Sequence, residues 1–540
     1  MLFFAIPISM FSQIYKDDFK ILESKLIGIC KNSNLLSLVK LGETAKKNTI
    51  WAVEITKDKQ QKKPALFIVA GMETNQIAGV NASLKIIEFF KNNVGLDSIA
   101  NLLKNNNIYI VPIANPDAFE RWTTKPILET NQNSLKINND RDFLFDEDDF
   151  EDLNNDGYIT LMRVEDSTGN FVCHNEDPRI MVQNPKGKLG KYKIFTEGID
   201  NDKDELWNED AKMGLDPNKS FPVDFEWFGN TTGEYPMQAV EAKLLANYLF
   251  DRPEIFAVLC FNSENNLTEP YEFNRNAVTE PLINGWLEND AAVNKKISDI
   301  YKKHISNSEK SVGYSSGCFS KWVYLHTGRW SFSTPTCWVN KYKKGDSTIT
   351  DSLKIKVLKD VDNADLNFLY WAESVGMKDV FVDWKTYFHS DFPGKKVEIG
   401  GFVPYSKQRF HDSVLTKSSD LHIKFIYSLV KTRAELQFCN TIVDKLDNGI
   451  FRLTTTLINV GDLPTCSELG MRTKWVHKVR TKIELNAKQK LLSGVPILVN
   501  QKLNAKESIT MTWLIKGDGQ MKLISGSQIT GFTELKLNFK

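Results

Sequence analysis

Buried-strand patterns alternate with helical patterns in the first half of the chain. Residues 64–71 (PALFIVAG) form a continuous apolar run that ends in glycine, which is typical of a strand buried on both faces of a sheet. Apolar residues then recur at helical spacing over 77–91. Further short buried strands are predicted at 107–111 and 256–261, the second preceded by a helix over 238–250. This alternation predicts an α/β core with a parallel or mixed sheet.

The last part of the chain follows a different pattern. From about residue 423, short alternating segments such as 451–458, 476–485 and 508–515 are separated by turn signals, for example Asp447-Asn448-Gly449. This spacing predicts a small antiparallel β-sandwich, with the polar stretch 403–422 as its linker. The predicted domains are 13–405, an α/β domain with an acidic insertion at about 138–180, and 423–540, the all-β sandwich.

Composition and charge narrow the classes of partner. The 540 residues are 41% hydrophobic and 25% charged, as in ordinary globular proteins. The 68 basic and 68 acidic residues cancel, so bulk charge gives no indication of nucleic acid or of an anionic membrane as a partner.

The first residues resemble a targeting segment. The apolar run Leu2–Phe11 has the length of the hydrophobic part of a signal peptide, and Ser12 is a tolerable cleavage position. We therefore predict a signal peptide over 1–12 and a secreted or periplasmic protein. The positively charged start of such a peptide is missing, so a buried N-terminal segment is the alternative. No later stretch is long and apolar enough to predict a transmembrane segment.

Polar motifs stand where the predicted strands end, which is where α/β folds bind ligands. Five segments occur in a characteristic order and resemble signatures of the zinc carboxypeptidase family, as in a divergent bacterial member. They are Gly71-Met72-Glu73-Thr74-Asn75-Gln76, Pro112-Ile113-Ala114-Asn115-Pro116-Asp117, Asp216-Pro217-Asn218-Lys219-Ser220-Phe221, Phe261-Asn262-Ser263 and the stretch 317–338.

The resemblance implies a carboxypeptidase-like fold, a mixed sheet flanked by helices, and a zinc hydrolase site. In that family two His and one Glu hold the zinc, and the open fourth position holds water. A second Glu deprotonates this water, and Arg side chains bind the terminal carboxylate of the substrate.

The positions that match the zinc ligands carry other residues. They are Glu73, Gln76 and Asn262, and neutral carboxamides are poor zinc ligands. The catalytic Glu corresponds to Pro335 or Thr336, depending on whether one counts forward from Gly328 or back from Trp338.

Three candidates for substrate binding remain. Lys219 replaces the Arg of the family motif and keeps its charge without the bidentate fork, whereas Asn218 and Tyr324 match the family.

Glu398 could replace the lost base from another strand, although a structural role is the better interpretation. The seven histidines show no zinc-binding spacing.

Two further features allow alternative interpretations. Asp152, Asn154 and Asp156, followed by Gly157, match the start of a calcium loop, but Arg163 stands where the bidentate Glu belongs. A calcium site and a solvated acidic loop both remain open. Seven aromatic residues flank the predicted cleft, and we expect most of them to be core rather than a ligand groove. They are Trp122, Trp227, Phe228, Trp322, Tyr324, Trp330 and Trp338.

These residues predict an exported, non-catalytic member of the family without a cofactor. It would bind a peptide or a protein C-terminus in the former active-site cleft. One alternative is an active zinc carboxypeptidase with altered ligands. A second is a structural or adhesion protein that acts through the β-sandwich.

Overall fold

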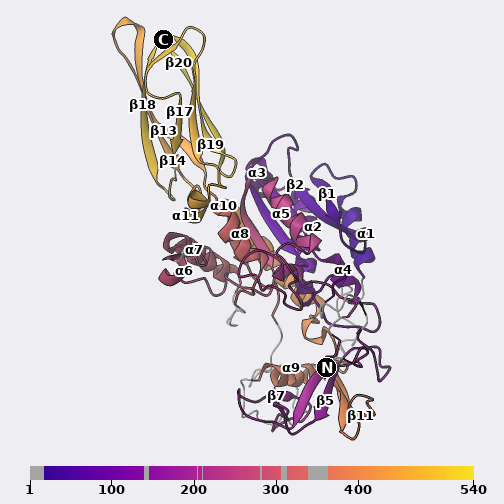
Figure 1. Ribbon diagram of the computed structural model, residues 1–540. Coiled ribbons are helices and arrows are strands. Elements are labelled where there is room, and N and C mark those ends of the chain that lie inside the picture. Colours follow the sequence, from indigo (N-terminus) through magenta and orange to yellow (C-terminus); the bar gives the residue numbers. More distant parts are fainter. Residues whose placement is uncertain are drawn as a thin grey trace, which may run out of the picture.

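Three parts make up the molecule. The computed structural model describes residues 18–138, 145–146, 148–203, 205–208, 211–279, 282–305, 313–338, 363–500 and 502–540, so the predicted signal peptide lies outside it. Figure 1 shows a central α/β unit with a long β-sandwich at one end and a smaller lobe at the other.

A six-stranded mixed sheet forms the centre of the α/β unit, in the order β1-β2-β4-β3-β9-β10. β3, β4, β9 and β10 run parallel to one another. β2 pairs antiparallel with both of its neighbours, β1 and β4. Every residue of β3, β4 and β9 is buried, as the continuous apolar runs predicted. The strands are β1 (Leu36–Glu43), β2 (Thr49–Ile55), β3 (Ala65–Ala70), β4 (Asn107–Val111), β9 (Ile255–Phe261) and β10 (Trp330–Ser333).

Helices cover both faces of this sheet, which confirms the α/β prediction. One apolar cluster joins the sheet to α2, α3, α7 and α10, and a second joins the opposite face to α5 and α8. Those helices are α2 (Ile77–Asn93), α3 (Asp97–Asn105), α5 (Val240–Phe250), α7 (Glu288–His304), α8 (Phe319–Thr327) and α10 (Asp412–Thr432). The other helices of this unit are α1 (Phe19–Cys30), α4 (Pro116–Glu120) and α6 (Arg275–Thr279).

Helix α10 corrects the predicted linker at 403–422. Residues from Asp412 onward are helical and pack against α2 and α7. His422, on this helix, is fully buried and lies edge-on to Phe261 of β9. Ser413 and Lys417 lie on the exposed face of this amphipathic helix, whereas Ser419 is buried.

A second sheet forms the small lobe in Figure 1, in the order β11-β12-β5-β8-β6-β7. This sheet joins strands of the predicted acidic insertion to β11 and β12, which lie about two hundred residues later in the chain. The insertion therefore extends beyond residue 180, to the end of β8 and further to the later strands. Its elements are β5 (Leu161–Glu165), β6 (Phe171–Cys173), β7 (Met181–Gln183), β8 (Tyr192–Thr196), β11 (Phe381–Tyr387), β12 (Val397–Phe402) and the covering helix α9 (Ala364–Ser374).

Two four-stranded antiparallel sheets form the C-terminal part, in the orders β13-β14-β18-β16 and β17-β15-β19-β20. They enclose an apolar core around Trp513, as the alternating pattern predicted. The elements are β13 (Leu436–Lys445), β14 (Ile450–Asn459), α11 (Glu468–Thr473), β15 (Val479–Glu484), β16 (Lys490–Ser493), β17 (Ile497–Asn500), β18 (Ser508–Lys516), β19 (Gly519–Ser527) and β20 (Gly531–Phe539).

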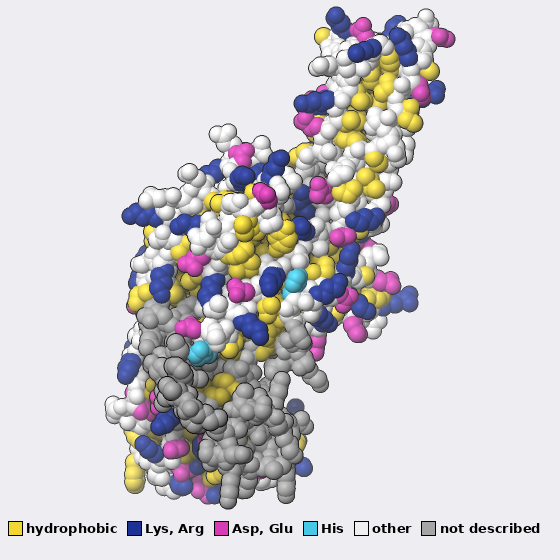
Figure 2. Space-filling model, turned by 180° about the vertical axis from the view of Figure 1, so that it is seen from behind, with side chains coloured by type: hydrophobic (Ala, Val, Ile, Leu, Met, Phe, Trp, Pro, Cys, Tyr) yellow, Lys and Arg dark blue, Asp and Glu magenta, His cyan; other side chains and the backbone are white. Residues whose placement is uncertain are grey.

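The surface of the sandwich carries exposed apolar side chains. Figure 2 shows a band of hydrophobic side chains along one side of it. Val443, Ile497 and Val499 are among the exposed ones. None of the described helices has the length and hydrophobicity needed to cross a membrane.

Candidate functional site

The carboxyl ends of the parallel strands meet at one edge of the central sheet. β3 lies between β4 and β9, and β10 follows β9. The chain leaves β3 through Gly71, whose φ is +63°. A Cβ at this position would lie 2.9 Å from the backbone of Pro112 and Ile113 beyond β4, so the turn requires glycine. This turn leads to Glu73, directly before the short helical turn Thr74–Gln76 and α2.

The Glu73 carboxylate is buried and fully engaged by protein donors. Asn218 donates its side-chain amide to Glu73 Oε1 over 2.6 Å. Ser263, directly after β9, donates its backbone N–H to Oε2 over 2.9 Å and its hydroxyl to Oε1 over 3.1 Å. Sequence order thus correctly brought the β3 end, the 216–221 motif and the β9 end together.

Two further carboxyl groups, Glu264 and Asp216, lie beside Glu73. Asn218 Nδ2 also lies 3.0 Å from Glu264 Oε1, which accepts a second hydrogen bond of 3.0 Å from the Ser315 hydroxyl. Burial, and after it the negative charge of Glu73, raises the pKa of Glu264 to about 8. The same two causes raise the pKa of Asp216 to about 7.

The Glu73 carboxyl likewise has its pKa raised by burial, against the hydrogen bonds from Ser263 and Asn218. Close, buried carboxyl groups cannot all ionise cheaply, so this cluster holds protons at neutral pH. No sequence motif pointed to Glu264, and Asp216 stands in the 216–221 motif without a predicted role. The signal that could have identified Glu264 is a carboxylate directly after the Phe261-Asn262-Ser263 motif.

Two of the other family positions, Asn262 and Thr336, carry unpaired polar groups. Asn262 is fully buried, and neither its amide nitrogen nor its amide oxygen has a hydrogen-bond partner among the described residues. Thr336 is also buried, and its hydroxyl has no hydrogen-bond partner among the described residues. Its backbone carbonyl accepts a hydrogen bond from the Ser418 hydroxyl. Gln76 and Pro335 are half-buried. Such unpaired groups are uncommon in protein interiors and usually face water or a ligand.

Lys219 lies beside the cluster, next to a loop with exposed aromatic residues. Its ammonium group is 3.4 Å from the Thr231 hydroxyl. The loop is fixed to the 216–221 motif by a hydrogen bond between Asp216 N–H and the Thr231 carbonyl. Trp227 is 61% exposed and Phe228 58%.

Most of the other aromatic residues expected near the cleft are core, as predicted. Trp122, Trp322, Tyr324 and Trp330 are all buried, and Trp338 packs against the core.

Tyr324 does not contact this cluster. Its hydroxyl donates to Asp290 Oδ2 over 2.9 Å and accepts from the Leu287 N–H over 3.1 Å. Its ring stacks on Trp286 at a centroid distance of 3.8 Å. These contacts fix a fully buried side chain between α7 and α8, so they give no support to the predicted role in substrate binding.

The residues at this site do not fit a zinc ion. A zinc site in this family needs three protein ligands of the His and carboxylate type, and of the three ligand positions only Glu73 carries such a group, because the other two are Gln76 and Asn262. Its oxygens already accept three hydrogen bonds. Within the described ranges, no group of three or more His, Cys, Asp or Glu side chains is arranged to hold a metal.

The predicted calcium loop is closed by its own side chains. Asp152 accepts from the N–H groups of Asp156 and Gly157 over 3.0 and 2.7 Å, and Asn154 accepts from Asp156 N–H over 2.9 Å. Asp156 in turn accepts from Tyr158 N–H over 2.9 Å. These turns shape the loop without a metal, and calcium binding stays a prediction.

Glu398 has a structural role. It lies on β12 opposite Arg163 of β5, and its Oε2 is 2.9 Å from Arg163 Nε. Lys396 lies 2.9 Å from its other oxygen. Arg163 and Glu398 are each 8% exposed, and the Arg163 guanidinium also lies over the Trp384 ring.

We expect Glu398→Ala to destabilise the small lobe by about 3 kcal/mol, because it leaves the Arg163 charge buried and without its carboxylate. Urea unfolding followed by tryptophan fluorescence measures this. Glu165→Ala is the matched control on the neighbouring strand. Its ion pair with Lys191 is exposed, so it should cost less than about 1 kcal/mol. Equal losses in the two variants would contradict the structural role of Glu398.

Family comparisons cover most of the chain. The sequence model described as zinc carboxypeptidase matches residues 29–337, more than half of the chain. A second model, described as a domain of unknown function, matches residues 435–538, which comprise the two sheets of the sandwich.

Individual relatives are distant. Carboxypeptidase A4 of Mus musculus is 30% identical over 89 residues, which are 16% of this chain and 20% of the mouse protein, so the match spans one fifth of that relative. Bovine thrombin-activatable fibrinolysis inhibitor, solved with a tick carboxypeptidase inhibitor, is 12% identical over 78% of this chain and 98% of its own, with a TM-score of 0.41. Carboxypeptidase A of Helicoverpa armigera is 13% identical over 59% and 63%, with a TM-score of 0.36.

Proposed function

Because this chain belongs to the zinc carboxypeptidase family, we propose that it is an exported member that binds a peptide without hydrolysing it. The former active-site cleft would hold the C-terminal end of a peptide or protein. Catalysis would be lost because the zinc ligands and the general base have been replaced together.

The observation that carries this proposal is the hydrogen-bond network around Glu73. Asn218 joins Glu73 to Glu264, and Ser263 closes the other side of the Glu73 carboxylate. A carboxylate satisfied by three neutral donors is held in place by the protein and needs no metal. Replacement of the other two ligand positions by Gln76 and Asn262 supports the same conclusion.

Peptide binding is supported by what surrounds this network. Lys219 keeps a positive charge where the family binds the terminal carboxylate, and the exposed Trp227 and Phe228 lie on the adjoining loop. The unpaired amide of Asn262 can still hydrogen-bond to a bound backbone. Export rests on the apolar run at the N-terminus and stays a prediction.

Incubation with a pool of synthetic peptides, half with free C-termini and half amidated, tests the proposal. We expect free C-termini to be retained on the protein in size-exclusion chromatography, with every peptide intact by mass spectrometry. Lys219→Gln and Trp227→Ala should each weaken retention about tenfold, since one removes a charge partner and the other an aromatic contact. Trp475→Ala is the control, because Trp475 is similarly exposed at 58% but lies on the C-terminal part of the chain.

Two results would contradict the proposal. Peptides shortened at the C-terminus would show that catalysis survives. Equal retention of free and amidated peptides, or none of either, would show that the cleft does not recognise a terminal carboxylate.

A further inference from the structure

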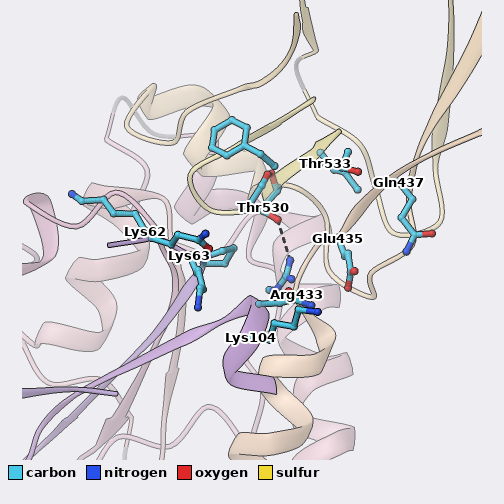
Figure 3. A pocket seen from close by; sticks show the side chains of 14 residues that line it. Lys62, Lys63, Lys104, Arg433, Glu435, Gln437, Thr530 and Thr533 are labelled. Atoms are coloured by element: carbon cyan, nitrogen blue, oxygen red, sulfur yellow. Dashed lines mark hydrogen bonds between the residues drawn. The ribbon is translucent and has the colours of Figure 1, made fainter. Parts of the chain in front are cut away.

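A cavity of about 550 Å³ lies where the β-sandwich meets the α/β unit, away from the Glu73 network (Figure 3). Its walls come from four places in the sequence: the loop before β3, the end of α3, the segment that leads from α10 into β13, and the turn between β19 and β20 with the start of β20. The volume is within the range of small-molecule sites.

The walls of this cavity are strongly cationic. Lys62, Lys63, Lys104 and Arg433 line it, against the single carboxylate of Glu435. Hydroxyl and amide side chains also line it, among them Thr533, Gln437 and Asn105. Like charges repel when they gather around one cavity, so this arrangement costs stability unless an anion offsets it.

Two of these cations are buried. Arg433 is 7% exposed and Lys63 8%. Within the described ranges, neither is in an ion pair with a carboxylate: Lys63 Nζ donates to the Leu103 carbonyl over 3.3 Å, and Arg433 donates to Asn106 and to the carbonyls of Ala434 and Thr530. Buried charges are normally paired.

Arg433 is also held in a fixed orientation. Its Nε and Nη1 are used by these three acceptors, which come from the residue directly after α3, from its own segment and from the β19–β20 turn. Its Nη2 has no protein acceptor among the described residues and stays available. Figure 3 shows the guanidinium beneath the turn that carries Thr530, with Lys104 beside it in this view.

We propose that this cavity binds a small ligand that carries a phosphate or sulfate ester. A fixed guanidinium with neighbouring ammonium groups is the usual protein complement of a tetrahedral oxyanion. Phe532, 65% exposed at the rim, offers an apolar contact to the rest of the ligand. Because the walls come from both the α/β unit and the sandwich, the bound ligand also ties these parts together.

The test measures binding to the whole chain by isothermal titration calorimetry at constant ionic strength. The probes are glucose 6-phosphate, glucose 6-sulfate and glucose itself. We expect one or both esters to bind with one-to-one stoichiometry and to raise the thermal unfolding midpoint, while glucose does neither. If both esters bind, the site recognises the tetrahedral oxyanion that they share. If only one binds, the site selects between phosphate and sulfate.

Lys62→Gln/Lys104→Gln separates this site from non-specific charge effects. Both lysines are exposed, so the variant should fold normally, and we expect its affinity for the ester to fall about tenfold. Lys488→Gln/Lys490→Gln is the control, since it removes the same charge from exposed lysines near the far end of the sandwich and should bind as the wild type does.

Three results would overturn the proposal. They are no binding of either ester above that of glucose, unchanged affinity in Lys62→Gln/Lys104→Gln, or an equal loss in the control variant. Arg433→Lys adds a second comparison because it keeps the charge and loses the fork. Since the cavity and the Glu73 network share no residue, failure here leaves the peptide-binding proposal untouched, and the reverse also holds.

Discussion

The variant Glu73→His/Gln76→Glu/Asn262→His is expected to bind one equivalent of zinc and to hold it at least about 100-fold more tightly than the wild-type chain does. The three substitutions place two His and one Glu where the family holds its metal. They also remove the carboxylate that Asn218 and Ser263 now satisfy. Metal analysis after dialysis, followed by competition with a chromogenic chelator, measures the gain.

Hydrolysis of C-terminal peptide substrates should remain undetectable in this variant. Neither Pro335 nor Thr336 can deprotonate a metal-bound water, so zinc binding should return before activity. Asn262→His alone is the control and should bind no zinc. A folded triple variant, verified by circular dichroism, that binds no zinc would show that these three positions are not the ligand positions.

Glu264→Gln is expected to raise the free energy of unfolding by about 4 kcal/mol at pH 8.5 and by no more than about 1 kcal/mol at pH 5. The pKa of Glu264 is raised from about 4.5 in the unfolded chain to about 8 in the folded one. Between these values the folded chain binds more protons than the unfolded chain, so the contribution of Glu264 to stability decreases as pH rises through this window. Glutamine cannot ionise, so the variant loses this dependence.

Urea unfolding at several pH values measures this difference. Glu272→Gln removes an exposed carboxylate and should shift stability by less than about 0.5 kcal/mol at every pH. If Glu264→Gln destabilised the chain equally at pH 5 and pH 8.5, then the Glu264 carboxyl would be ionised throughout. The claim that the carboxyl groups around Glu73 hold protons at neutral pH would then be wrong.

The parts of the fold that sequence patterns predicted are those whose burial is local. β3, β4 and β9 are buried along their whole length, and their apolar runs predicted them within one residue. The sandwich strands β14 and β18 alternate cleanly, because one face meets the core and the other meets water.

The parts that were missed depend on long-range pairing. β11 and β12 join β5 and β8 across about two hundred residues, and no local pattern reports such a partner. Residues 412–422 of α10 were taken for part of a linker because this stretch is rich in Ser and Lys, and residues 423–432 were assigned to the sandwich domain. The buried face of α10 packs against α2 and α7, which are distant in the sequence, so the local pattern did not identify it.

The candidate site shows the same division. Strand ends and motif order correctly brought Glu73, Asn218 and the Asn262 segment to one edge of the sheet. The motif positions could not show that Tyr324 turns toward Asp290, since its hydroxyl partner lies on α7. Nor could they show that Glu264 and Asp216 gather beside Glu73, because raised pKa values depend on burial and on neighbouring charge.

The zinc content of the wild-type chain tests the central claim most directly. Protein purified without chelators is exposed to excess zinc, dialysed, and measured by inductively coupled plasma mass spectrometry, with hydrolysis of C-terminal peptide substrates followed in parallel. A chain that retains well below one equivalent of zinc and cleaves none of the substrates matches the account. One tightly held zinc per chain, together with release of C-terminal residues, would contradict it.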